Sequence, residues 1–172
     1  LLEAGHDLRV WNRTAQAMEP LRQAGATATQ NPRLAVQGAD IVFSMLRDDD
    51  AARQVWCDPD TGAFAGMPAG ALAVECSTLS VPGILSLAKA AGEHAIPFLE
   101  APLAGSRPQA EAGKLIFLAG GDTPDLERGE PLLKVMGAAV HHCGPLGSGA
   151  VTKLMVNALF GAQVALMGEL LE

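Results

Sequence analysis

The sequence has few basic residues and no long, uninterrupted apolar run. Its 172 residues include 12 Lys and Arg against 19 Asp and Glu, a net charge of −7. No basic face is apparent that would neutralise phosphates, which argues against a nucleic-acid partner. The apolar runs are broken by glycine, proline or charge, and no signal-peptide pattern is present. We therefore expect a cytoplasmic globular protein without a bilayer-spanning segment or a membrane partner.

Cysteine is also scarce. Cys57, Cys76 and Cys143 are odd in number and far apart, which is typical of reduced thiols rather than of disulfides or a zinc site. We expect all three to have packing roles. The adjacent side chains of His141 and His142 alternate across a predicted strand and cannot converge on one metal ion without other ligands. The sequence therefore predicts no metal site.

Strand-like and helix-like segments alternate along the chain, without an internal repeat or a low-complexity linker. The predicted strands cover residues 8–11, 26–29, 41–46, 72–75, 96–99, 115–118 and 138–142. The main predicted helices cover residues 15–24, 32–36, 80–91 and 151–171, and helix starts are also expected at 48–50 and 120–123. This alternation is typical of a Rossmann-like, doubly wound α/β fold with a mostly parallel sheet.

A glycine fingerprint of the form GxGxxG is absent. If the strand at 8–11 is the second strand of a dinucleotide-binding fold, that fingerprint and the first strand would precede Leu1. The chain also begins without methionine and ends at Glu172, inside a helix whose apolar sides would be uncovered without further chain. We therefore expect a fragment of a larger protein.

The tip of the first predicted strand carries Asn12, Arg13 and Thr14. An acidic residue at this position would bind the ribose 2′-hydroxyl of NAD, whereas an arginine accommodates the 2′-phosphate of NADP. The planar guanidinium of Arg13 suits phosphate oxygens, and Thr14 could add a hydroxyl or cap the next helix. These residues favour NADP over NAD, although a polar turn without a ligand explains them equally well on their own.

A glycine-rich segment at 144–149 runs into the apolar helix at 151–171, and a helix that is apolar on nearly every side is usually buried. Lys153 and Asn157 lie four residues apart and therefore project from one face of this helix. A buried ammonium titrates at a lower pH than a free one, which suits a proton donor or acceptor near neutral pH. The alternative is that the aliphatic part of the Lys153 side chain packs on apolar surface while its ammonium group reaches water.

Six motifs, in this order, resemble the β-hydroxyacid dehydrogenase family, which includes 3-hydroxyisobutyrate dehydrogenases and glyoxylate/succinic semialdehyde reductases and is related to 6-phosphogluconate dehydrogenase. They are GHDLRVWNRT (5–14), SMLRD (44–48), ECST (75–78), LEAPLAGS (99–106), GGD (120–122) and GPLGSGAVTKLMVN (144–157). The resemblance implies an NAD(P)-binding domain at 1–146. Residues 147–172 would be the start of an interdomain helix. That helix would lead to an all-helical domain through which full-length members usually form homo-oligomers.

The resemblance also implies roles for single residues. Lys153 corresponds to the catalytic acid/base, and Asn157 to a helper that binds substrate and orients the lysine. Met45 and Leu46 resemble the segment that lies along the cofactor. Thr78, with the serine before it, resembles the pair near nicotinamide and substrate.

The predicted substrate loop departs from the family pattern, because the usual Asp-Ala-Pro-Val-Ser-Gly-Gly is here Glu-Ala-Pro-Leu-Ala-Gly-Ser at 100–106. Ala104 replaces the serine that ordinarily helps to hold the substrate carboxylate. Backbone N–H groups around Gly105 and Ser106 could still bind a carboxylate. The Gly-Ser pair followed by a basic residue most resembles the glyoxylate/succinic semialdehyde reductase branch.

The function implied is an NADP-preferring oxidoreductase, with NAD as a second cofactor, acting on a small β-hydroxyacid or its aldehyde or semialdehyde. Two alternatives stay open at this point. One is a non-catalytic binding or scaffold protein on the same fold, for which Ala104 leaves room. The other is an imine reductase-like enzyme, against which Lys153 counts because relatives that reduce imines usually lack this lysine.

Overall fold

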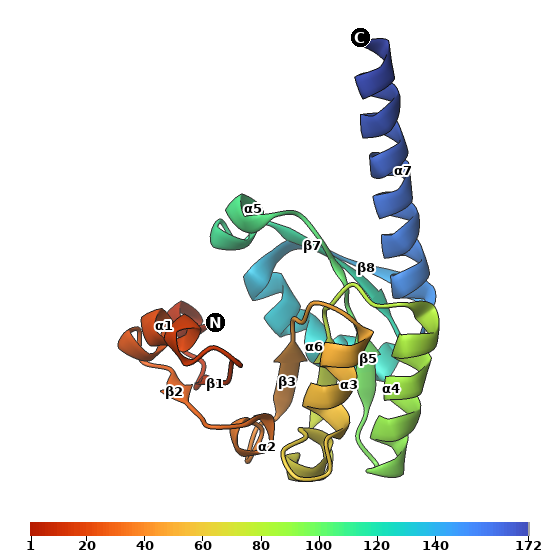
Figure 1. The fold of residues 1–172 in the computed structure, drawn as a ribbon. Helices are drawn as coiled ribbons and strands as arrows, with labels where there is room; N and C mark the ends of the chain where they lie inside the picture. Colours follow the sequence, from red (N-terminus) through yellow and green to blue (C-terminus); the bar gives the residue numbers. More distant parts are fainter. Residues whose placement is uncertain (172) are drawn as a thin grey trace.

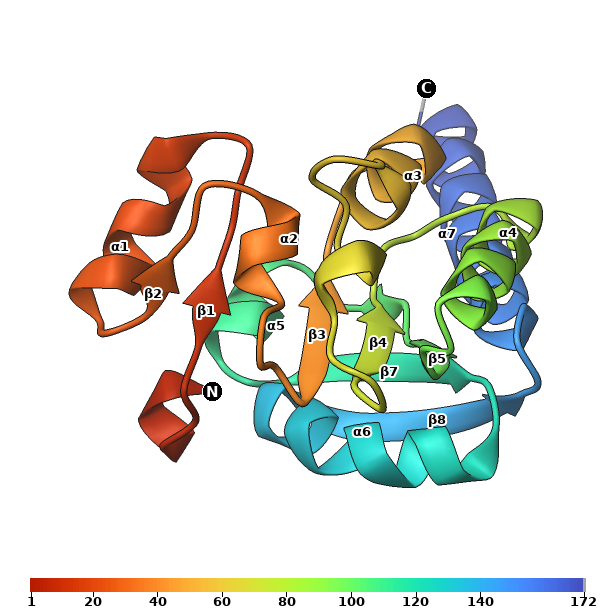
Figure 2. The ribbon, with the colours of Figure 1, turned by 90° about the horizontal axis from the view of Figure 1, so that it is seen from below.

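The computed structural model describes residues 1–171 as an α/β fold with a six-stranded sheet and a separate two-stranded sheet beside it (Figures 1 and 2). In the main sheet, β3 (Ile41–Ser44), β4 (Leu72–Glu75) and β5 (Phe98–Glu100) are parallel neighbours. The two-stranded sheet pairs β1 (Arg9–Val10) with β2 (Thr27–Ala28), also in parallel. The predicted Rossmann-like fold class is confirmed.

The far half of the main sheet is mixed rather than parallel. Strand β7 (Leu115–Gly120) runs antiparallel to β5 and to the short β6 (Leu103–Ala104), and parallel to β8 (Gly137–Gly144). The sequence analysis did not predict β6 or the helix α5 (Arg107–Glu111) that follows it. Both elements are short, and β6 exists because β7 supplies its hydrogen-bonding partner.

Helices cover both faces of the main sheet (Figure 2). Helices α3 (Asp49–Cys57) and α4 (Val81–Glu93) lie on one face, and α6 (Thr123–Met136) lies on the other. The remaining helical segments are short, and the predicted helix at 15–24 is a 3-10 turn followed by one α-helical turn. They are Leu2–Ala4, Ala15–Met18, α1 (Glu19–Gln23), α2 (Pro32–Ala35) and Phe64–Gly66.

The helix starts agree with the capping predictions. Asp48 accepts a hydrogen bond from the Ala51 N–H at 2.9 Å at the start of α3, and Ser80 accepts one from the Gly83 N–H at 3.0 Å at the start of α4. These bonds satisfy backbone donors that the first helical turn leaves without partners. Asp122 occupies the residue before α6, as predicted for a turn that opens a helix.

Strand β4 divides the core, because successive side chains of a strand point to opposite faces of the sheet. Leu72, Val74 and Cys76 pack in the cluster on the α6 face, whereas Ala73 belongs to the cluster that contains Trp56 of α3. Cys76 is buried, which confirms the predicted packing role for this thiol. That prediction is wrong for Cys57, which is exposed at the end of α3.

Helix α7 (Ser148–Leu170) begins at the sheet and extends away from it (Figure 1). The expectation that this apolar helix is buried is wrong, because its only buried residues among those described are Gly149 and Ala150. We also expected no segment that is long and apolar enough to cross a membrane. That expectation is wrong, because α7 meets both conditions by length and composition. Single glycines and Lys153 do not interrupt the helix. Helices that pack against other protein share this composition.

Candidate nucleotide and catalytic site

The carboxyl ends of β3, β4 and β5 lie side by side at one edge of the main sheet. Ser44 is paired in register with Glu75, and Glu75 with Glu100, so three neighbouring strands end at the same level. In open parallel sheets, nucleotide ligands bind outside this edge. The segments that follow these strands carry Met45, Leu46 and Thr78, three of the predicted cofactor residues, and the fold therefore brings them to one edge.

A buried glutamate joins the two segments that carry these residues. The Glu75 carboxylate accepts hydrogen bonds from the Ser44 hydroxyl at 2.5 Å, the Trp56 indole N–H at 2.7 Å and the Ser77 backbone N–H at 2.8 Å. The Ser77 hydroxyl in turn accepts the Leu46 N–H at 2.7 Å. Because the three bonds to Glu75 are buried and the fourth is partly buried, the network holds the ends of β3 and β4 in one arrangement.

The residues predicted to meet the cofactor differ in exposure. Met45 is 52% exposed and Thr78 is also exposed, whereas Leu46 is partly buried against the core. Met45 offers an apolar surface after β3, and Thr78 offers a hydrogen-bonding group after the neighbouring β4. Their roles toward a cofactor stay predictions.

The turn after β1 places Asn12, Arg13 and Thr14 on the surface. The Asn12 side-chain oxygen accepts the Thr14 backbone N–H at 2.8 Å, which is the local turn that asparagine favours. The Thr14 hydroxyl makes no capping hydrogen bond to the helical segment that follows, within the described residues. The structure therefore does not show the capping role that was considered for Thr14.

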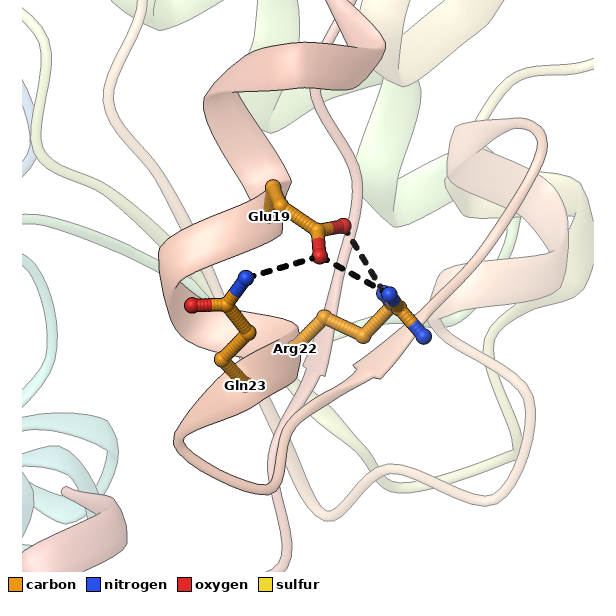
Figure 3. Close-up of polar contacts among 3 residues, drawn as sticks. All are labelled: Glu19, Arg22 and Gln23. Atoms are coloured by element: carbon orange, nitrogen blue, oxygen red, sulfur yellow. Dashed lines mark hydrogen bonds and ion pairs between the residues drawn. The ribbon is translucent and has the colours of Figure 1, made fainter.

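Arg13 and Arg22, which both lie between β1 and β2, have different surroundings. Arg22 donates two hydrogen bonds to Glu19, at 2.9 and 2.8 Å, and Gln23 donates a third at 3.0 Å (Figure 3). The bonds from Arg22 and Gln23 lower the pKa of Glu19 to about 2. Arg13 forms no ion pair with any residue from 1 to 171. Its guanidinium is therefore available to an anionic ligand.

The charge of Arg13 also acts on the segment after β3. The pKa of Asp48 lies below its usual range, chiefly because it accepts the Ala51 N–H and a hydrogen bond from Arg47, while the charge of Arg13 acts in the same direction. Arg47, the residue after Leu46, is paired with Asp48 at 2.7 Å. The ends of β1 and β3 thus present basic groups toward the same region.

Lys153 and Asn157 lie in the first turns of α7. Lys153 is partly buried, and burial lowers the pKa of its amine, whereas Asn157 is exposed. The Lys153 amine therefore loses its proton at a lower pH than an ordinary lysine does. This is the direction that a general acid/base lysine needs, and the role of Lys153 stays a prediction.

The predicted substrate loop runs from the end of β5 through β6 to the start of α5, and Gly105 and Ser106 lie between β6 and α5. Gly105 has a φ of +120°, a conformation that L side chains rarely adopt. The Ser106 backbone N–H and hydroxyl both donate to the Gln109 side-chain oxygen, at 2.9 and 2.6 Å. A substrate carboxylate at Ser106 would compete with Gln109, a residue that the sequence analysis did not single out. The substrate roles of Gly105 and Ser106 stay predictions.

Two buried carboxylates at this edge were also missed by the sequence analysis. Glu75 and Glu100 are both fully buried, and each is the charged last residue of an otherwise apolar strand. That pattern is a usable signal, because an acid at the end of a buried strand must find hydrogen-bond donors. A third acid, Asp49, accepts the Ser80 N–H at 2.9 Å and the Ser80 hydroxyl at 2.5 Å, which ties α3 to the start of α4.

Residues 1–144 match the NAD binding domain of 6-phosphogluconate dehydrogenase as a protein family. The chain belongs to this family. Membership in the 6-phosphogluconate dehydrogenase NAD-binding family agrees with the resemblance drawn from the six motifs, and it establishes that this fold is of the NAD(P)-binding type.

Individual members of the family resemble the chain over most of its length. It is 38% identical to the chloroplastic glyoxylate/succinic semialdehyde reductase 2 of Arabidopsis thaliana, over 98% of this chain and 47% of that protein. It is 40% identical to an NAD-dependent L-serine dehydrogenase of Pseudomonas aeruginosa, over 92% of this chain and 53% of that protein.

Among solved structures, the 3-hydroxyisobutyrate dehydrogenase of Mycobacterium tuberculosis with L-serine superposes with a TM-score of 0.91 at 29% identity. The superposition covers 98% of this chain and 56% of that one. The chain thus spans about half the length of the family members that it matches.

Proposed function

We propose that the full-length protein containing this chain is an NADP-preferring oxidoreductase that interconverts a small β-hydroxyacid and its aldehyde or semialdehyde. The observation that carries the proposal is Lys153, a partly buried lysine of lowered pKa on the helix that begins at the nucleotide-binding edge of the sheet. The relatives named for reduction of glyoxylate or succinic semialdehyde, and for dehydrogenation of L-serine, support this reaction class.

The chain's own residues supply the proton chemistry. A bound nicotinamide cofactor supplies or accepts the hydride at the substrate carbon. Lys153 donates its proton to the oxygen that becomes an alkoxide during reduction, and takes it back from the hydroxyl during oxidation. Asn157 lies one helical turn further along the same face, where its amide can bind the substrate and orient the lysine.

The residues at the strand ends fit a dinucleotide. Arg13 carries a guanidinium without an ion-pair partner in the described part of the chain, which suits a 2′-phosphate. Asn12 and Thr14 flank it with polar groups, whereas Met45 and Leu46 offer an apolar surface at the neighbouring strand. In this proposal NAD is bound as the weaker cofactor, since no carboxylate occupies position 13 to bind its ribose hydroxyls.

The substrate contacts are proposed at Thr78, Asn157 and the loop at Gly105 and Ser106. Ala104 removes one hydroxyl that the family pattern provides, a loss of about 1 kcal/mol of binding if a carboxylate oxygen goes without that hydrogen bond. The carboxylate is then bound by backbone N–H groups of the loop, and the Ser106 N–H exchanges its bond to Gln109 for one to the substrate.

The test is oxidation of NADPH, followed by absorbance, with the full-length protein and a panel of glyoxylate, succinic semialdehyde and related carbonyl compounds. We expect turnover with at least one short aldehyde or semialdehyde that carries a carboxylate. A protein that binds NADPH but turns over none of them would contradict the proposal and favour the binding or scaffold alternative. Turnover confined to cyclic imines would favour the imine reductase-like alternative.

Replacing Arg13 by aspartate should weaken NADP binding by about tenfold or more, because a hydrogen bond to a charged group contributes about 1.5–3 kcal/mol. NAD binding should change much less, since NAD lacks the 2′-phosphate. Dissociation constants for both cofactors, measured by fluorescence titration, provide the comparison. Arg22→Ala is the matched control, because its guanidinium is held by Glu19 and both affinities should stay unchanged. Equal losses for NADP and NAD in Arg13→Asp would rule out a 2′-phosphate contact.

A further inference from the structure

The first turn of α7 is held by a side chain that is distant in the sequence. Three backbone N–H groups, those of Gly147, Gly149 and Ala150, donate to the Glu100 carboxylate at 2.6, 2.9 and 2.9 Å. Gly147, the residue before the helix, has no side chain that could cap it and adopts a φ of +95°. Glu100, at the end of β5, therefore does the work of the missing local cap.

Glycines make the space for this carboxylate. A Cβ on Gly120 of β7 would lie 2.2 Å from the Glu100 Oε1 atom. A Cβ on Gly149 would lie 2.3 Å from the Leu118 carbonyl oxygen and 3.1 Å from the Glu100 Cδ atom. Strands β5 and β7 and helix α7 thus approach one another around a single buried acid.

This contact is where α7 is anchored. Gly149 and Ala150 are the only residues of the helix that are buried within the described chain. Lys153 follows Ala150 by less than one helical turn, at 3.6 residues a turn. The direction in which the Lys153 side chain leaves the sheet therefore depends on how the first turn is seated.

We propose that Glu100 is the positioning residue for Lys153: its carboxylate seats the first turn of α7 on the carboxyl end of β5 and so aims the amine at the strand-end edge. This inference rests on the function proposed above for Lys153. Glu100 and Glu75 are register partners on neighbouring strands. At one level of the sheet, Glu75 therefore joins the predicted cofactor segments and Glu100 holds the first turn of α7.

The contact uses both oxygens of the acid. Burial raises the pKa of Glu100, and the three N–H hydrogen bonds act against that shift. Both carboxylate oxygens accept, Oε1 from two N–H groups and Oε2 from one. A glutamine would keep one accepting oxygen and turn an NH₂ group toward the remaining N–H donor. An aspartate would keep the charge and both oxygens, but its shorter side chain would draw them back from the helix.

The experiment compares Glu100→Gln with Glu75→Gln in the full-length enzyme. Glu75→Gln is the matched control, because Glu75 is equally buried at the same level of the sheet but bonds to β3, α3 and the segment after β4 rather than to α7. We expect Glu100→Gln to lower kcat by roughly 10- to 100-fold, as a misplacement of about 1 Å does. Its KM for the cofactor should change less than about twofold, since its hydrogen bonds hold the catalytic helix rather than the cofactor segments.

Glu75→Gln should have the reverse effect: its KM for the cofactor should rise, and its kcat should change less than that of Glu100→Gln. Equal effects of the two variants on kcat would mean general loss of stability and would overturn the inference. Glu100→Asp covers the case in which Glu100→Gln does not fold. Its kcat should lie below that of the wild type, and a wild-type kcat in Glu100→Asp would overturn the inference.

A readout without turnover separates this inference from the proposed function. Acetylation of Lys153 by acetic anhydride, followed by peptide mass spectrometry, reports the reactivity of the amine directly. If Glu100→Gln changes this reactivity while Lys153→Ala keeps full turnover, the positioning role stands and the proposed function fails. If Lys153→Ala is inactive while Glu100→Gln leaves kcat and Lys153 reactivity unchanged, the positioning role fails and the function stands.

Discussion

Replacement of Lys153 by alanine should lower kcat for carbonyl reduction by about 10²- to 10⁴-fold, the range that a positioned general acid provides. The loss follows because the variant lacks the proposed general acid that supplies the proton as hydride reaches the carbonyl carbon. Cofactor affinity should stay within about threefold of the wild type, since the predicted cofactor contacts lie at the ends of β1, β3 and β4. Steady-state rates and cofactor titration of the full-length protein provide both measurements.

The controls for this prediction separate proton transfer from positive charge. Lys153→Arg keeps a cation but should remain nearly inactive, because a guanidinium does not give up its proton in proteins. Lys134→Ala removes a lysine that is paired with Glu130 on α6 at 2.9 Å and should leave kcat unchanged. Undiminished turnover in Lys153→Ala would refute the proposed acid/base role.

Gly149→Ala should destabilise the fold by about 3 kcal/mol or more, at the upper end of what overpacking costs. The added Cβ would lie 2.3 Å from the Leu118 carbonyl oxygen, which belongs to the backbone of β7 and cannot rotate away. Either α7 must move off the sheet or β7 must bend. Thermal unfolding followed by circular dichroism should show a clearly lower midpoint.

Gly92→Ala is the matched control for Gly149→Ala. Gly92 lies in the last turn of α4, is exposed, and has nothing within 4 Å of an added Cβ. Alanine there should stabilise by about 0.5–1 kcal/mol, because it restricts the unfolded chain and favours the helix. Equal unfolding midpoints for the two variants would show that α7 does not pack closely on β7.

Local signals in the sequence predicted the elements that satisfy their own backbone. The β4 bounds were predicted without error, because Leu72–Glu75 is a short apolar run between turn signals. Asp48 and Ser80 were recognised as helix starts for the same reason, since a cap bonds to backbone only a few residues away. The short strand β6 carries no such signal, and its existence depends on β7.

The candidate site divides in the same way. Arg13, Met45, Leu46, Thr78 and Lys153 were predicted from motifs, because each stands at a fixed offset from a strand end or a helix start. The acids that hold these segments were not found. Glu100 lies 47 residues before the first N–H group that it binds, and Glu75 lies 31 residues after Ser44. Nothing local in the sequence links such partners.

The exposure of α7 shows the limit of composition as a guide. An apolar helix predicts burial, but burial needs a partner surface, and residues 1–171 supply one only to the first turn. The sequence by itself determined the alternation of strands and helices and the family, since these depend on residue type and local spacing, and it singled out Lys153 as the predicted acid/base. Only the tertiary structure decided which buried carboxylate holds which segment and where Lys153 is anchored, because those contacts join residues that the chain alone does not bring together.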